Sequence, residues 1–206
     1  MKERPILFSG AMVGAILDGR KSQTRRVIKD FKIERLSSRN EFATSGPHQL
    51  SLKETPGYAY VELESGALVG LPCPYGQPGD RLWVREAWRT VAEADSLPPR
   101  NLNAAHRIWY EADAPHQPGF GKYRPPMFMP RLASRVTLEI TNVRVERVKN
   151  ISQSDVFAEG IKNADMRPEE SAQQAFSRLW DSINAARGYG WEVNPWVWVI
   201  EFRRVS

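Results

Sequence analysis

The chain of 206 residues is 41% hydrophobic and 26% charged, which is ordinary for a globular protein and long enough for a substantial core. Its net charge of +5 permits nucleic-acid binding without requiring it. No apolar run is long enough to span a membrane and no signal-peptide pattern follows Met1, so we expect a cytoplasmic protein without a membrane partner. Cys73 is the only cysteine, which excludes an intramolecular disulfide framework.

The N-terminal pattern predicts a strand followed by a short helix. A short apolar run predicts a buried strand over 5–8. Hydrophobic residues then recur at helical spacing, which predicts a helix over 11–18. Ser9 is placed to cap the first turn of this helix, and Gly19 supplies the left-handed residue that ends it.

A basic cluster follows this helix, beside a predicted strand over 22–28. Four cations surround three hydroxyl or amide side chains: Arg20, Lys21, Arg25 and Arg26 around Ser22, Gln23 and Thr24. The first 30 residues hold seven cations against three anions, so most of the positive excess lies here. Two interpretations are open, namely a solvated edge strand whose cations discourage aggregation, or a surface that binds nucleic acid.

The rest of the chain mixes clear elements with weaker segments. Alternating apolar residues predict strands over 80–86, 134–148 and 196–203. Two helices are predicted, over 152–159, where it ends at Gly160, and over 168–184. Two segments are predicted as insertions, at about 29–77, with a hairpin over 58–69, and at about 89–126, with a short strand over 106–112.

Two strings of the sequence resemble a known family. Residues 16–26, Ile-Leu-Asp-Gly-Arg-Lys-Ser-Gln-Thr-Arg-Arg, are similar to the opening signature of ASCH domains, a branch of the PUA-like superfamily associated with RNA. Gly79-Asp80 before Leu82 resembles the turn into a barrel strand in that group. The whole chain resembles phage and prophage ASCH proteins. The resemblance implies an α+β fold in one domain over 1–206: a small, closed, mixed PUA-like β-barrel with short helices outside it and the two long insertions.

Three positions match residues proposed as catalytic in the amidohydrolase branch of that group, which deacylates N4-acetylcytidine. The resemblance implies that Thr24 is the nucleophile, Lys21 the base and Glu159 a proton shuttle, with no cofactor or metal. A threonine hydroxyl needs an adjacent base, and a lysine acts as one only if burial or nearby cations lower its pKa. We therefore expect the three side chains to converge within about 8 Å, the reach of direct or one-water contact.

Strand geometry opposes this convergence. Residues three apart on a regular strand face opposite sides, so Lys21 and Thr24 meet only if Ser22-Gln23 forms a turn or bulge. Taken singly, each position is better explained as a structural residue, namely a surface cation, a strand residue and an exposed helix acid. The joint match, in the expected order, favours a shared pocket. If they line a wet cleft, Lys21→Ala and Thr24→Ala should leave the stability almost unchanged.

The partner expected from the resemblance is a modified nucleoside or a single-stranded nucleic acid, RNA rather than DNA, bound by a monomer. The expected binding residues are the polar and basic signature residues and three aromatic residues at element ends: Arg20, Ser22, Gln23, Arg25, Arg26, Trp88, Tyr189 and Trp191. Two other functions stay open. One is a non-catalytic module that reads RNA or modified bases, and the other is a protein-interaction module whose insertions form the binding surface.

Overall fold

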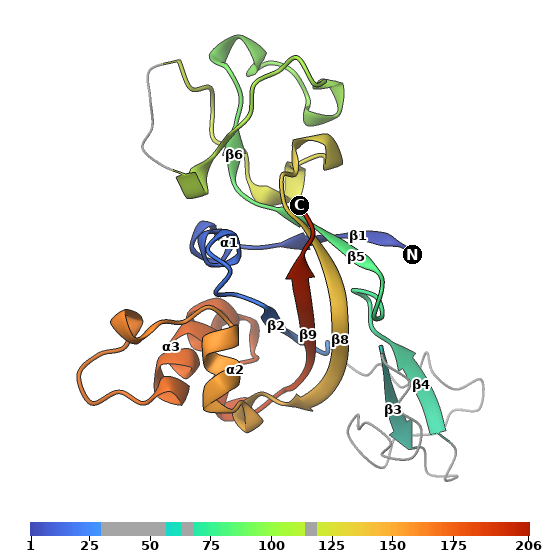
Figure 1. The fold of residues 1–206 in the computed structure, drawn as a ribbon, viewed down its shortest axis with the longest axis vertical. Coiled ribbons are helices and arrows are strands. Elements are labelled where there is room, and N and C mark those ends of the chain that lie inside the picture. Colours follow the sequence, from blue (N-terminus) through green and yellow to red (C-terminus); the bar gives the residue numbers. More distant parts are fainter. Residues whose placement is uncertain (30–56, 63–67, 114–118) are drawn as a thin grey trace.

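A five-stranded mixed sheet organises the protein. The computed structural model describes residues 1–29, 57–62, 68–113 and 119–206 (Figure 1). The sheet has the order β1-β5-β8-β9-β2, and only the β1–β5 pair is parallel. Its strands are β1 (Glu3–Leu7), β5 (Arg81–Arg85), β8 (Thr137–Arg147), β9 (Trp196–Arg204) and β2 (Gln23–Val27). All five lie where the sequence predicts strands, and the mixed α+β class is confirmed.

The sheet is open, which corrects the expectation of a closed barrel. Within the described residues, the edge strands β1 and β2 share no ladder of hydrogen bonds. The helix α1 (Gly10–Leu17) connects them instead, and its Val13 and Ile16 pack into the same core as the sheet. Ser9 caps α1, and Gly19 follows it with φ +73°, as predicted. Across the opening, the Arg26 guanidinium donates to the Leu7 carbonyl oxygen at 2.7 Å.

The predicted region 134–148 forms one long strand with a bulge. The register between β8 and β9 shifts between Ile140 and Asn142. Because the shift adds one residue, the alternation changes phase, and Ile140 and Val143 both enter the main core. The residues before and after the shift therefore belong to the single strand β8.

The last strand, β9, separates two cores. Trp198 and Ile200 face the main core with Phe8, whereas Val197 and Val199 face a second core. Two helices cover the second core, α2 (Gln153–Ala158) and α3 (Ala172–Asn184), on one side of the sheet (Figure 1). The helix α3 starts four residues later than predicted, because Ser171 and Gln174 form a capping box there.

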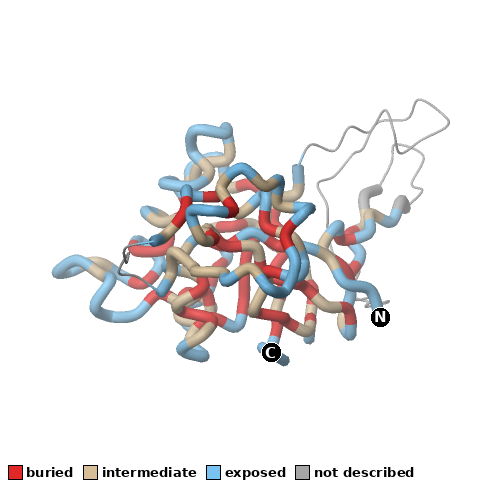
Figure 2. Tube along the Cα trace, turned by 90° about the horizontal axis from the view of Figure 1, so that it is seen from above, coloured by how far each residue is buried: buried red, intermediate tan, exposed pale blue. Residues whose placement is uncertain are grey.

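The predicted insertions contain regular structure of their own. The hairpin of β3 (Tyr58–Glu62) and β4 (Leu68–Pro72) is antiparallel as predicted, although its turn and residues 30–56 lie outside the described residues. In the second insertion, the strand predicted over 106–112 is only β7 (Trp109–Tyr110), paired with β6 (Trp88–Arg89). This region forms a third core from Trp88, Ala94, Leu102, Met129 and Ala133. Figure 2 shows the buried segments in the interior of the molecule and the exposed ones mainly around its rim.

Short 3-10 turns connect the longer elements. They are Ala92–Ala94, Pro99–Asn101, Glu111–Asp113, Pro126–Phe128, Arg131–Ala133, Val148–Asn150, Asn163–Asp165, Ala185–Arg187 and Trp191–Val193. Among the described residues, no helix combines the length and the apolar character that crossing a membrane requires.

Candidate functional site

Two of the three predicted catalytic residues form a buried ion pair. The Lys21 ammonium donates to Glu159 Oε2 at 2.7 Å and to the Glu159 carbonyl oxygen at 2.8 Å. Their side chains are 0% and 5% exposed. The backbones also meet, since the Ser22 amide donates to the Ala158 carbonyl oxygen at 2.9 Å. Burial lowers the pKa of Lys21, and this effect outweighs the opposite influence of Glu159.

A glycine allows this close approach. Gly160 ends α2 with φ +97°, and a Cβ atom there would lie 2.9 Å from Ala15 Cβ and 3.1 Å from Lys21 Cβ. The missing side chain lets the end of α2 contact α1 and the start of β2. Glu159 is therefore carried to Lys21 by backbone packing as well as by charge.

We expect Gly160→Ala to lower the free energy of unfolding by roughly 2–4 kcal/mol, because a left-handed alanine costs about 1–2 kcal/mol and the clash adds to it. Gly19→Ala is the matched control, since Gly19 has φ +73° and no atom lies within 4 Å of the position that a Cβ would take there. That variant should lose only the conformational part, about 1–2 kcal/mol. Urea unfolding measures both, and equal losses would mean that close packing at Gly160 is unimportant.

Arg25 holds the second oxygen of Glu159. Its Nη1 donates to Glu159 Oε1 at 3.2 Å, and its Nη2 contacts Asp155 Oδ2 at 3.0 Å and Glu146 Oε1 at 2.5 Å. The Arg25 side chain is 1% exposed. Burial raises the pKa of Asp155, but the charges of Arg25 and Arg144 reverse this, and the net pKa is below the usual value. The prediction that Arg25 contacts nucleic acid is wrong, because acids from β8 and α2 enclose it.

Thr24 lies on the other face of β2. It pairs with Ile200, which faces the main core, whereas Arg25 pairs with Val199 of the second core. The β2–β9 ladder runs without a register shift from Gln23, so Thr24 faces the main core. Lys21 precedes the ladder, and its Nζ lies 5.7 Å from the ring centroid of the main-core residue Phe8. Thr24 is 3% exposed, and within the described residues its hydroxyl makes no hydrogen bond to Lys21 or Glu159.

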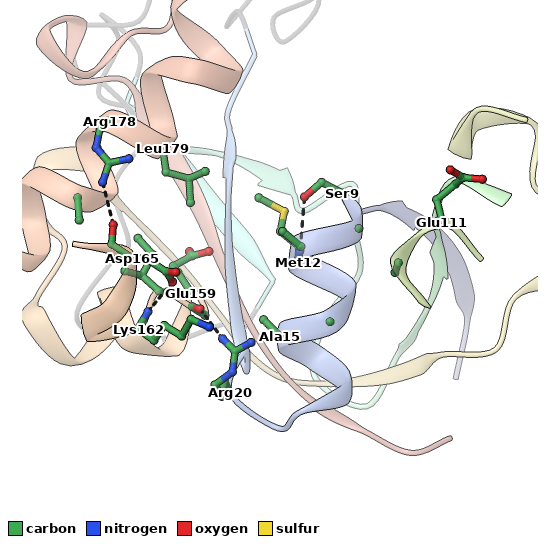
Figure 3. Close-up of a pocket in the computed structure, with 17 residues that line it drawn as sticks. Ser9, Met12, Ala15, Arg20, Glu111, Glu159, Lys162, Asp165, Arg178 and Leu179 are labelled. Atoms are coloured by element: carbon green, nitrogen blue, oxygen red, sulfur yellow. Dashed lines mark hydrogen bonds between the residues drawn. The ribbon is translucent and has the colours of Figure 1, made fainter. Parts of the chain in front are cut away.

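A cleft of about 610 Å³ lies beside the ion pair, between α1 on one side and residues 159–165 and α3 on the other (Figure 3). Glu159 lines it, and Lys21 lies behind Glu159. The charged residues that line it are Arg20, Glu111, Glu159, Lys162, Asp165 and Arg178. Arg20 pairs with Asp18, and Arg178 pairs with Glu170. Lys162 is exposed and has no ion pair within the described part of the chain, which leaves its charge available to a ligand.

The remaining predicted binding residues lie away from this cleft. Ser22 is exposed, and Gln23 is buried beside Arg25. Tyr189 and Trp191 follow α3, where the Trp191 ring packs against Phe176 with a centroid distance of 6.1 Å. Among the predicted binding residues, only Arg20 lines the cleft.

The prediction that Trp88 binds nucleic acid is wrong. It is 0% exposed in the third core, with the Arg124 guanidinium 5.3 Å from its ring centroid, so it cannot stack on a base. Its position after a strand suggested a loop aromatic. The structure instead packs it with Ala94, Leu102, Met129 and Ala133, and no local sequence signal indicates that packing.

Sequence reasoning also missed most of the cleft. In the sequence, ordinary polar residues precede and occupy α3, namely Lys162, Asp165 and Arg178. They line the cleft only because the fold places them opposite α1. Glu111 comes from the second insertion, where Ala112 lies opposite Gly10 of α1. Within the described residues, no group of three or more His, Cys, Asp or Glu side chains is arranged to hold a metal ion.

Comparison with known proteins adds one finding. No protein-family model matches the sequence, and no curated protein matches it. The crystal structure of protein EF3133 from Enterococcus faecalis is similar to this structure, and that protein is assigned to the family DUF984. The alignment covers 100% of this chain and 81% of the EF3133 chain. The TM-score is 0.44 and the identity 10%. A similarity this weak carries no argument about fold or function.

The arrangement has the parts that proton transfer requires. A lysine with a lowered pKa contacts a carboxylate at hydrogen-bond distance, and that carboxylate lines a cleft. Such a pair can exchange a proton with a group in the cleft. The two cations on the carboxylate also fix its orientation, which favours a defined reaction geometry.

Proposed function

We propose that the protein is an amidohydrolase that removes the acyl group from an N4-acylated cytidine-type nucleoside. Thr24 is the nucleophile, Lys21 the base and Glu159 the proton shuttle. The observation that supports this most is the buried Lys21–Glu159 pair beside a cleft. Burying an ion pair costs desolvation energy that its attraction often fails to recover, and strongly perturbed groups gather at functional sites.

The chemistry proceeds through an acyl-threonine. Glu159 accepts a proton from the Lys21 ammonium, and the neutral amine takes the Thr24 proton as the hydroxyl oxygen attacks the acyl carbon. The resulting oxyanion collapses, the carbon–nitrogen bond breaks, and the N4 nitrogen leaves with the proton held by Glu159. Water then hydrolyses the ester, which releases the carboxylic acid and restores Thr24.

This sequence of steps requires the Lys21 amine to turn toward the face of β2 that carries Thr24. That face is within its reach, because Lys21 Nζ already lies 5.7 Å from the ring centroid of Phe8, a main-core residue. We also propose that the protein is related to PUA-like domains. Its sheet is an open form of their barrel, in which α1 connects the edge strands β1 and β2 that a closed barrel would pair.

The cleft suits a ligand of this size. Its volume of about 610 Å³ is within the range of small-molecule sites, roughly 300–1,000 Å³. Lys162 and Arg178 on its lining suit a nucleotide phosphate or the backbone of a short single strand. Glu159 on the same lining is the acidic member of the buried ion pair.

Mass spectrometry of N4-acetylcytidine incubated with the protein tests the proposal. We expect the wild type to release cytidine, and Thr24→Ala to lose about 10³-fold or more in kcat. Thr24→Ser should retain part of the activity because it keeps the hydroxyl. Thr141→Ala is the matched control, since Thr141 is exposed at the bulge of β8 and should react at the wild-type rate. No cytidine from the wild type, with this or other N4-acylated substrates, would remove the enzyme proposal.

One observation favours a non-catalytic reader as the second candidate. The Lys21 ammonium is held by two Glu159 acceptors, and within the described residues no hydrogen bond joins it to Thr24. A reader would bind the modified nucleoside or a short RNA without forming product. Its affinity should fall steeply with salt, and Lys162→Glu should weaken it. Fluorescence anisotropy on the same ligands measures this.

A further inference from the structure

Two consecutive arginines have opposite environments. Arg25 is enclosed by the carboxylates of Glu146, Asp155 and Glu159. Arg26 takes part in no ion pair within the described part of the chain. Its one hydrogen bond there runs to the Leu7 carbonyl oxygen, and its Nε is buried without a partner. The charge of Arg25 is therefore compensated by direct ion pairs, whereas within the described residues no carboxylate lies at ion-pair distance from Arg26.

The cation of Arg26 lies on the side of Thr24. Arg26 pairs with Trp198 and Thr24 with Ile200, and both partners face the main core, so the two side chains project from one face of β2. Residues two apart on a strand have Cα atoms roughly 6.6 Å apart, a distance within the reach of an arginine side chain. The ring of Phe8 joins the group, with Arg26 Cζ 5.1 Å and Lys21 Nζ 5.7 Å from its centroid.

We propose that Arg26 forms an anion site with Thr24 and Lys21 over the Phe8 ring, which takes the acyl oxygen as it becomes an oxyanion and then the carboxylate of the released acid. This role rests on the proposed hydrolysis. Negative charge develops on that oxygen when the hydroxyl of Thr24 attacks, and a fixed donor at that point stabilises the transition state. Arg25 cannot serve, because its donors are already directed at three carboxylates.

The surroundings of Arg26 agree with this role. Burial lowers the pKa of Arg26, although Tyr75 and Glu159 act in the opposite direction. A cation that is poorly hydrated and lacks an ion-pair partner gains more from an incoming anion than an exposed one does. The simpler alternative is that Arg26 only bridges the opening between β1 and β2 through Leu7, and the experiment separates the two roles.

The test uses the full chain and sodium acetate, the product anion, titrated by NMR against sodium chloride at constant ionic strength. Arg26→Gln keeps a donor for Leu7 but removes the charge. We expect it to raise the acetate Kd by about tenfold or more. It should also lower kcat on N4-acetylcytidine about 100-fold with KM changed less than about threefold. Arg26→Lys should fall between. Arg203→Gln, an exposed arginine of β9 that pairs with Glu139, is the control and should change neither quantity.

The outcomes separate this proposal from the one on which it rests. An acetate Kd unchanged in Arg26→Gln, or a wild type that does not bind acetate, overturns the anion site. Acetate binding that depends on Arg26, in a protein that hydrolyses no acylated cytidine, supports the anion site and overturns the hydrolase. If Arg26→Gln does not fold, the Arg26 Nε–Hε resonance of the wild type decides. It should shift on addition of acetate, and no shift overturns the proposal.

Discussion

Arg25→Met should lower the free energy of unfolding by about 3–5 kcal/mol, the usual effect of breaking a buried ion pair from one side. Arg25 is the common partner of Glu146, Asp155 and Glu159, and its side chain is 1% exposed. Methionine fills much of the same volume but leaves three carboxylates facing one another. Their mutual repulsion and their lost solvation both favour the unfolded chain.

Urea unfolding of Arg25→Met beside Arg203→Met measures this effect. Arg203 has one surface partner, Glu139, and a side chain that is 66% exposed, so its replacement should change the stability by less than about 1 kcal/mol. A similarly small loss in Arg25→Met would show that the three acids are solvated or protonated and that the buried network is not a stabilising feature. A charge reversal at Arg25 should destabilise the fold further, so a loss of nucleic-acid binding in such a variant would not identify Arg25 as a contact.

The Lys21–Glu159 pair should show strong coupling in a double-mutant cycle. We expect Lys21→Met to cost about 2–4 kcal/mol and Glu159→Leu about 3–5 kcal/mol, since each leaves a buried charge without its partner. The double variant should lose at least about 1–3 kcal/mol less than the sum, because it removes both charges together. This differs from the expectation drawn from a wet cleft, because the Lys21 side chain is 0% exposed and the premise of a wet environment does not hold for it.

The cycle needs a control for volume and helix effects. Gln153→Leu, at the exposed start of α2, changes a polar side chain to leucine without touching an ion pair and should alter the stability by less than about 0.5 kcal/mol. Equilibrium unfolding in urea gives all values. Additive losses at Lys21 and Glu159 would mean that the two groups do not stabilise each other, and the proton relay between them would lose its physical basis.

Local signals in the sequence predicted the helices and strands but not whether the sheet closes into a barrel. Ser9, Gly19 and Gly160 act through their own backbone or the first turn of a helix, and all three perform the predicted roles. The open edge between β1 and β2 could not be predicted, since it depends on how α1 packs against strands from both ends of the chain. The bulge at Thr141 was not predicted for a related reason, because it is a shift of register against β9, which lies more than 50 residues further along the chain.

The candidate site could be predicted only in part, because most of its contacts join residues that are far apart in the chain. The pairing of Lys21 with Glu159 followed from resemblance, and the structure brings the two together. The burial of Arg25 depends on acids that lie more than 120 residues further along the chain, so a dense group of cations looked like a surface. Burial of Trp88 likewise depends on Met129 and Ala133, which no periodicity near Trp88 indicates.

The contact between Lys21 and Glu159 also has a consequence for protein synthesis. The two residues are separated by 138 positions, and a ribosome that adds 5–20 residues per second needs roughly 7–28 s to deliver the second after the first. During that interval Arg25 and Lys21 have emerged without their carboxylates, and neither can be buried at low cost. The nascent N-terminal segment should therefore stay solvated until α2 arrives, so that the site and the second core form together late in translation.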